Sequence, residues 1–156
     1  MRIRTHVRTP HARAQVRDWQ ARVRAEALRY GEVCTLLGRR RRLPDIASRS
    51  ASARGHAERA AINTPIQGSA ADIVALAMVE LAGDAPLRAM GYRMLLQVHD
   101  EILMEGPEAH AEEAQARMAH IMAHPFRDAE GGGFANRLDV ELAVDAGRAK
   151  NWYQAK

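Results

Sequence analysis

Apolar residues recur at helical spacing in the segment that follows the first dozen residues. Three or four positions separate successive members of this set, which are Val16, Trp19, Val23 and Ala27. Arg and Glu fill the intervening positions, as expected for a helix with one apolar face. Gly31 is a helix-terminating residue at the end of the pattern. The spacing therefore predicts an amphipathic helix from Gln15 to Tyr30.

A short apolar run and a basic run come next. The β-prone residues from Val33 to Leu37 indicate a short extended segment. Gly38 then opens a loop that contains the four consecutive arginines Arg39–Arg42, and Pro44 closes it.

Helical spacing returns in the middle of the chain. A second helix is predicted from Ser52 to Ala61, and helical character continues from Gln67 to Ala82. Thr64-Pro65 separates the two stretches. Thr suits an N-cap and Pro suits the first helical position, so either a new helix begins here or one long helix kinks. One face of the later stretch collects its apolar residues, Ile73, Leu76, Ala77 and Leu81.

The pattern then changes to strands. Residues 92–98 and 102–105 are strand-like, and Gly106-Pro107 ends the second run, so a β-hairpin is predicted with His99, Asp100 and Glu101 at or near its tip. A third helix is expected from Glu108 to Met122, followed by a flexible loop at residues 131–133 and a third strand at residues 138–144. The fold class is α+β, with helices packed on one face of a small antiparallel sheet.

Composition adds three limits. The 156 residues are one domain's worth, and 47% apolar residues argue against wholesale disorder. The net charge is +4, with the arginines gathered in the first 60 residues, which indicates a polyanion on one side or simply an Arg-rich genome. Cys34 is the single cysteine, so no disulfide framework forms within the chain. No apolar run is long enough to span a bilayer, so no membrane partner is expected.

The predicted hairpin tip is the first candidate site. A carboxylate at a strand end is held rigidly and faces solvent, which suits Mg²⁺, so Asp100 is the candidate metal ligand. Adjacent acids on a strand point to opposite faces, so Asp100 and Glu101 share one ion only if the tip bends. An ordinary polar turn is the competing interpretation.

Arg59, Asn63 and Gln67 form the second candidate site. They are spaced four apart and would make one polar stripe on a helix. Arg pairs with phosphate, and Asn and Gln can meet base edges in the minor groove, where acceptors are similarly placed for every base pair. A solvated helix face is the alternative, and a kink at Pro65 would turn Gln67 away.

The run Arg39–Arg42 is the third candidate site. Such a run fits contact with a phosphate backbone, which gives affinity without sequence specificity. Solubility or a localisation signal explains it equally well. Asp72, which lies among small residues, is expected to pair with an arginine or to cap locally.

Two longer strings resemble motifs of the family A DNA polymerases, the bacterial DNA polymerase I type. Residues 57–73 (AERAAINTPIQGSAADI) resemble the palm-side helix motif, and residues 96–101 (LQVHDE) resemble the third catalytic motif. Both occur in the family's order and at about its spacing. Residues 35–44 resemble the preceding basic loop, and Asn151-Trp152 resembles the closing segment. The resemblance covers about residues 16–156, and details such as Arg54-Gly55-His56 are most like the plant and algal organellar branch.

The resemblance implies a role for each candidate residue. Asp100 would be one of two aspartates that hold Mg²⁺ in a two-metal site for nucleotidyl transfer, with Glu101 as an accessory acid. The residues implied to contact the primer–template duplex near the growing end are His99, Arg59, Asn63 and Gln67, and Arg41 would touch the template backbone. The implied partners are a DNA primer–template duplex and deoxynucleoside triphosphates.

The departures from the family pattern shape the remaining expectations. Nothing here resembles the family's other catalytic aspartate or its nucleotide-gripping fingers helix. We therefore expect residues 1–14 to be an unassigned basic N-terminus and residues 15–156 to be the C-terminal part of a polymerase palm and fingers domain. Such a piece would need a missing N-terminal half to polymerise DNA. The alternative is a non-catalytic DNA-binding module derived from a polymerase. The organellar branch implies a plastid or mitochondrion, and otherwise the bacterial cytoplasm or nucleoid.

Overall fold

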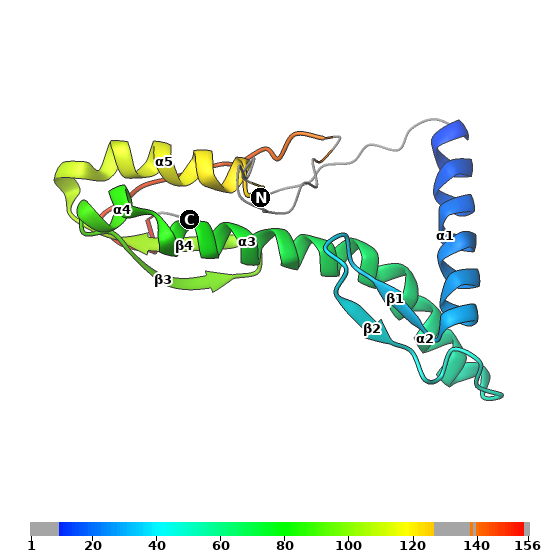
Figure 1. Cartoon of the computed structure of the whole chain (residues 1–156). Coiled ribbons are helices and arrows are strands. Elements are labelled where there is room, and N and C mark those ends of the chain that lie inside the picture. The colour runs from blue at the N-terminus through cyan, green and yellow to red at the C-terminus, as the bar shows by residue number, and fades with distance from the viewer. Residues whose placement is uncertain (1–9, 127–137, 139, 155–156) are drawn as a thin grey trace. The chain divides into compact units, whose positions relative to one another are not determined.

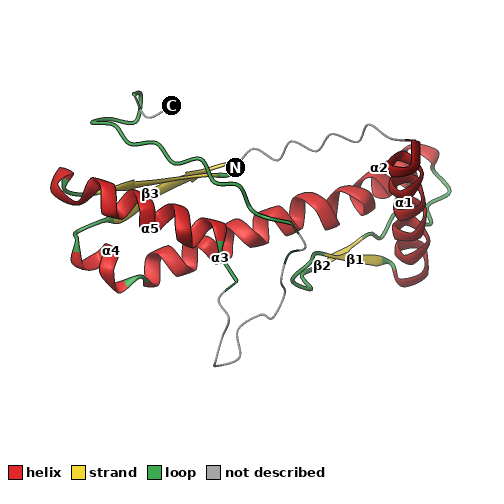
Figure 2. Ribbon diagram, turned by 90° about the horizontal axis from the view of Figure 1, so that it is seen from above, coloured by secondary structure: helices red, strands yellow, loops and turns green. Residues whose placement is uncertain are grey.

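The structure, a computed structural model, describes residues 10–126, 138 and 140–154 of the chain. Helices dominate the described part, with two separate antiparallel strand pairs (Figures 1 and 2). The predicted α+β class is confirmed, with the sheet present as two hairpins. The described residues fall into two compact units, one ending at Asp72 and the other beginning at Ile73, and each is described by itself.

The first unit begins with α1 (Pro10–Tyr30), which ends where the sequence predicts. Gly31 follows with φ +70°, a conformation that glycine adopts without steric cost, and its N–H donates to the carbonyl of Ala27 at 2.8 Å. The chain then turns into β1 (Glu32–Cys34).

Three of the four residues of the basic run form a strand, so the prediction of a loop was wrong for Arg40–Arg42. Residues 40–42 form β2 (Arg40–Arg42), which pairs antiparallel with β1 so that Val33 faces Arg41. A short loop joins the strands. It contains a tight turn in which the N–H of Gly38 donates to the carbonyl of Thr35 at 3.0 Å, and the N–H of Thr35 donates to the carbonyl of Arg39 at 2.9 Å. The ladder of hydrogen bonds with β1 outweighs the low strand propensity of a charged run.

Small residues bring the elements of the first unit together. Ala27 of α1 and Ala61 are both fully buried, and side chains without bulk let two helix backbones approach closely. The buried cluster around them contains Val23, Val33, Leu43, Ile46 and Ala57, with Trp19 and Ala60 packed against it. Val16, at the start of the predicted apolar face, is 43% exposed.

The Thr64-Pro65 interruption is neither a new helix start nor a simple kink. After α2 (Ala51–Asn63), with Ser50 as its N-cap, comes η1 (Thr64–Gly68), a π-helical turn that leads directly into α3 (Ser69–Gly83). Pro65 has no N–H to give the helix, and a wider turn is one way to absorb that loss. Two hydroxyls take up carbonyls around it, Thr64 donating to Ala60 at 2.7 Å and Ser69 donating to Pro65.

The uninterrupted helix also corrects the expectation that no segment could span a bilayer. By length and composition alone, Ala51–Gly83 is long and apolar enough to do so. In the sequence, Pro65 divides the apolar positions into two stretches, and neither stretch alone reaches that length. A central helix of a water-soluble protein has the same character, and Arg59 and Asp72 lie within this one.

The second unit contains the predicted hairpin. A short helix that the sequence analysis missed, α4 (Ala85–Ala89), precedes β3 (Arg93–Val98), which pairs antiparallel with β4 (Glu101–Glu105). The register shifts between Met94 and Leu96, so Leu95 is the extra residue of a β-bulge and is half exposed. A 3₁₀ turn, η2 (Glu108–His110), then leads into α5 (Ala111–Ala123).

Leucines and methionines from three helices and the hairpin form the core of this unit. Leu81 of α3 and Leu87 of α4 are its largest fully buried side chains, packed with Ala114 and Ile121 of α5. The partly buried residues around them are Met90, Tyr92, Met94, Ile102, Met104, Met118 and Met122. The methionines therefore fill the core, as expected of a chain with so few aromatic residues.

One predicted strand does not form. The described residues of the segment 138–144 have no strand structure, although Leu142 is buried. Their alternation satisfies the pattern of a strand, but a pattern alone supplies no partner for the backbone. The predicted loop at residues 131–133 lies outside the described residues.

A buried ion pair joins α4 to α5. The carboxylate of Asp84 is 1% exposed and accepts two bonds from Arg117, Nε–Oδ1 at 2.6 Å and Nη2–Oδ2 at 2.7 Å. It also caps α4, because the N–H of Leu87 donates to Oδ1 at 2.9 Å. The hydrogen bond to Asp84 raises the pKa of Arg117 against the opposing effect of burial.

We expect Asp84→Ala to lower the free energy of unfolding by about 2–4 kcal/mol, since it removes a helix cap and the partner of Arg117. Urea unfolding followed by circular dichroism measures the loss. Asp145→Ala, which removes an exposed acid of the same unit, should change it by less than about 0.5 kcal/mol. Equal losses in the two variants would contradict a special role for Asp84.

Candidate functional site

The hairpin tip is a two-residue turn. Val98 pairs with Glu101, which leaves only His99 and Asp100 between the strands and places Glu101 at the start of β4. His99 has φ +54°, a left-handed conformation that is uncommon outside glycine and is often found at functional turns. The side-chain amide of Gln97 donates to the carbonyl of His99 and so holds the turn from the neighbouring strand.

Asp100 is half-buried at this turn, and Glu101 beside it is exposed. Partial burial raises the pKa of the Asp100 carboxyl, whereas the hydrogen bond from its own backbone and the adjacent His99 lower it. The group is a carboxylate at neutral pH. A charged carboxylate on a tight turn is a suitable ligand for a hard divalent cation.

The hairpin does not provide a complete metal cage. In the described part of the chain, no group of three His, Cys, Asp or Glu residues is close enough to hold an ion. Asp100 and Glu101 supply oxygen donors of the kind that Mg²⁺ prefers, and Mg²⁺ commonly keeps several waters. The residues present therefore fit part of a magnesium site, and a further carboxylate would have to come from elsewhere.

The predicted polar stripe lies along the long helix of the first unit. Arg59 and Asn63 are one turn apart on α2, and Gln67 follows within the π turn of η1. All three side chains are exposed. Because a π turn contains more residues than an α turn, Gln67 is rotated relative to the position that a regular helix would give it.

The four arginines of the basic run have different surroundings. Arg39 donates from Nε to Oδ1 of Asp72 at 2.7 Å, which confirms the expectation that Asp72 pairs with an arginine. Arg40 pairs with Glu32 across its own hairpin at 3.1 Å. Arg41 donates from Nη1 to the hydroxyl of Thr64 at 3.2 Å. The run is therefore anchored to the long helix and is not a free basic loop.

The arrangement of the first unit puts two candidate sites next to each other. Thr64, the partner of Arg41, directly follows Asn63 of the stripe. In the sequence the basic run and the stripe are separate features, because their closest members, Arg42 and Arg59, are 17 residues apart. The hairpin tip with Asp100 belongs to the second unit.

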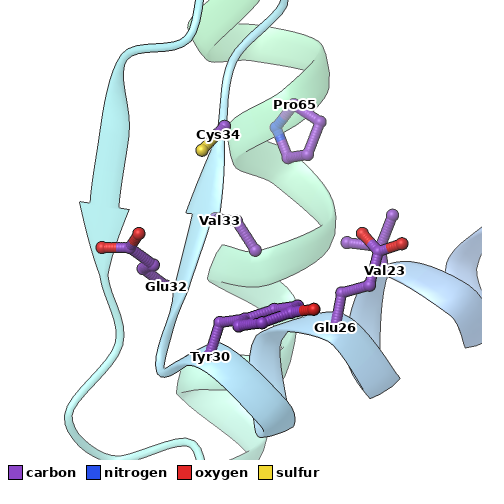
Figure 3. A pocket seen from close by; sticks show the side chains of 7 residues that line it. All are labelled: Val23, Glu26, Tyr30, Glu32, Val33, Cys34 and Pro65. Atoms are coloured by element: carbon purple, nitrogen blue, oxygen red, sulfur yellow. The ribbon is translucent and has the colours of Figure 1, made fainter.

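A shallow hollow of about 210 Å³ lies beside the β1 strand (Figure 3). Its lining residues come from α1, β1 and η1, and they are Val23, Glu26, Tyr30, Glu32, Val33, Cys34 and Pro65. None of the predicted site residues lines it. Cys34 is exposed at its edge, and its sulfur points away from Pro65 of the π turn.

Comparisons with known proteins identify relatives that are named as DNA polymerases. The chain is 48% identical over 144 residues to DNA polymerase I A, chloroplastic, of Oryza sativa subsp. japonica, which covers 92% of this chain and 13% of the relative. It is 46% identical to DNA polymerase I B, chloroplastic/mitochondrial, of Arabidopsis thaliana over the same shares. It is also 46% identical over 142 residues to the thermostable DNA polymerase I of Thermus thermophilus, which covers 91% of this chain and 16% of the relative.

The fold agrees with the sequence. The structure matches the POL domain of Pol1 from M. smegmatis, solved in complex with DNA primer-template and dNTP, with a TM-score of 0.78 and 35% identity. That match covers 93% of this chain and 26% of the solved one, so the chain spans a small part of the proteins it resembles. Residues 10–154 match the family described as DNA polymerase family A, and the chain belongs to that family.

Proposed function

We propose that this chain is the part of a family A DNA polymerase that grips the primer–template duplex and supplies Asp100 to the catalytic metal site. The observation that supports this proposal is the hydrogen bond between Arg41 and Thr64, which places the β1–β2 hairpin beside the exposed polar stripe. Thr64 directly follows Asn63 on the helix, and a cation near amide side chains is what a sequence-independent duplex grip needs. The residues 15–156 are then the C-terminal part of the palm and fingers.

The duplex contacts divide between backbone and bases. Arg41 neutralises a template phosphate, and Arg59 extends the same positive surface along α2. Asn63 and Gln67 meet minor-groove acceptors, whose similar placement in all base pairs allows the shape of the duplex to be checked without reading its sequence. His99, held in its strained turn, contacts the primer terminus in this proposal.

The chemistry is nucleotidyl transfer, with deoxynucleoside triphosphates as the second substrate. Asp100 would hold the divalent ion, Mg²⁺ in our proposal, and Glu101 would act beside it as an accessory acid. When bound, a pair of such ions lowers the pKa of the primer hydroxyl and stabilises the leaving pyrophosphate. The turn between β3 and β4 fixes the position of the Asp100 carboxylate relative to the primer end, and the partly buried strands behind it limit its motion.

A non-catalytic DNA-binding module is the second candidate function. It is favoured by one observation, the lack of a third metal-binding side chain near Asp100 among the described residues. The duplex grip of the first unit does not depend on a metal ion. Under this alternative, replacing Asp100 would have no measurable effect.

The proposed cellular location is taken from the names of the relatives. The plant relatives carry chloroplast or mitochondrial names, which supports a plastid or mitochondrion. Relatives from Thermus and Bacillus support the bacterial cytoplasm or nucleoid as the other location. Immunogold labelling in the source cells separates the two.

The 156-residue polypeptide by itself is expected not to extend a primer. One carboxylate cannot neutralise two divalent ions and the phosphates they hold, so an upstream polymerase half must supply the second aspartate. Incubation of the pure chain with a labelled primer–template, Mg²⁺ and all four nucleotides tests this. Extension that survives repurification would contradict the need for a second part.

The role of Asp100 is tested in a chimera in which this chain replaces the aligned 142 residues of the Thermus thermophilus relative. We expect Asp100→Ala to reduce primer extension by more than about a hundredfold, since it removes a direct metal ligand. Duplex binding should remain, because no phosphate contact is lost. Asp145→Ala serves as the matched control and should extend normally. Unchanged extension by the Asp100 variant would favour the non-catalytic module.

The duplex grip predicts a specific dependence on salt. For the chain bound to a primer–template duplex, Arg41→Ala should reduce the slope of log K against log[salt] by about one, because one phosphate contact is lost. Asn63→Ala should weaken binding with the slope unchanged, since its contact is uncharged. Fluorescence anisotropy at several salt concentrations measures both. Arg88→Ala, an exposed arginine of α4, should alter neither quantity, and an Arg41 variant with an unaltered slope would argue against a phosphate contact.

A further inference from the structure

The turn between β1 and β2 rests on the backbone of the π turn. The N–H of Leu36 donates to the hydroxyl of Ser69 at 2.7 Å, which ties the hairpin to the start of α3. At Gly68 a Cβ would lie only 2.7 Å from the methyl group of Thr35, a distance that real structures do not tolerate. The two segments are therefore in direct contact, and glycine at position 68 makes that approach possible.

Arg39 and Asp72 add a second link between the hairpin and the helix. The guanidinium of Arg39 bridges two points of the helix, Oδ1 of Asp72 at 2.7 Å and the carbonyl of Gly68 at 3.2 Å. The side chain of Asp72 is only 13% exposed, whereas that of Arg39 is 57% exposed. The arginine thus reaches from the hairpin surface to a carboxylate that the fold largely shields from water.

The second carboxylate oxygen of Asp72 indicates that an aspartate at this position depends on its pair with Arg39. Oδ2 is buried and has no hydrogen-bond partner among the described residues. An unpaired buried oxygen costs free energy, so an aspartate here is favourable only if its other oxygen makes a strong interaction. The bond with Arg39 is that interaction.

We propose that Arg39 and Asp72 are a positioning pair that docks the β1–β2 hairpin on the π turn and thereby sets Arg41 for the duplex. Arg39 does not contact DNA itself, because its charge is already used within the protein. This inference rests on the proposed function for its DNA consequence, although the docking itself is independent of DNA. Arg39 and Arg41, two residues apart on the same hairpin, then have different tasks.

The chain carries its own probe for this docking. Cys34 is the single cysteine, is exposed, and lies on β1 beside Pro65 of the π turn (Figure 3). A nitroxide spin label on its thiol reports the mobility of the hairpin against the helix by electron paramagnetic resonance. The full chain is used, well below its melting temperature, with circular dichroism to establish that each variant is folded.

We expect Asp72→Ala to increase the mobility of the label and to weaken duplex binding by about threefold to tenfold, as the loss of a partly exposed ion pair allows. Asp72→Asn keeps an oxygen acceptor for Arg39 and should fall between the wild type and Asp72→Ala in both measurements. Arg39→Ala repeats the test from the exposed side, where no cavity is left, and should match Asp72→Ala. Arg40→Ala is the matched control for mobility, because its partner Glu32 is on its own hairpin.

The salt dependence distinguishes positioning from direct contact. Arg39→Ala should weaken binding with the slope of log K against log[salt] unchanged, unlike Arg41→Ala. Tighter binding by Asp72→Ala, with a slope steeper by about one, would mean that Asp72 only masks a DNA-binding arginine, and it would overturn the proposal. An unchanged label mobility in both Asp72→Ala and Arg39→Ala would overturn it as well. If the wild-type chain binds no duplex, the proposed function fails, and the mobility measurements still decide the docking.

Discussion

The missing N–H of Pro65 is the constraint on which the first unit depends. A helix of 33 residues crosses this position without breaking, because the turn widens into η1 and two hydroxyls, from Thr64 and Ser69, take up nearby carbonyls. The same two hydroxyls also accept hydrogen bonds from the β1–β2 hairpin. Thr64 accepts one from Arg41, and Ser69 accepts one from the N–H of Leu36. The two residues that compensate for the missing N–H therefore also hold the β1–β2 hairpin on the helix.

The second unit solves a different problem, which is to hold a small hairpin with few large side chains. An isolated two-stranded hairpin is marginal in water, and here methionines and leucines of α3, α4 and α5 cover one side of it. Asp84 joins the start of α4 to the middle of α5 around this core. The hairpin that carries Asp100 is therefore supported by packing some distance from its turn.

Periodicity and turn residues predicted most of the elements, while contacts between distant residues decided the rest. The helix ending at Tyr30 and the hairpin around His99-Asp100 follow from local signals that the structure confirms. The strand of Arg40–Arg42 has no such signal, because it exists only through its pairing with β1. The alternation at residues 138–144 has the signal without a partner. The candidate site residues could be predicted from their types and spacing in the sequence. The approach of Arg41 to Thr64 could not, because it depends on folding across 23 residues.

Gly68 carries a consequence for how this protein can change over time. Because its α-carbon lies against the methyl group of Thr35, the two positions share one small volume. A lineage that acquires alanine at position 68 must first, or simultaneously, lose the branched side chain at position 35, and serine or glycine would make that room. Drift at either site is therefore conditional on the other, and the order in which the two substitutions arise decides whether the intermediate protein survives.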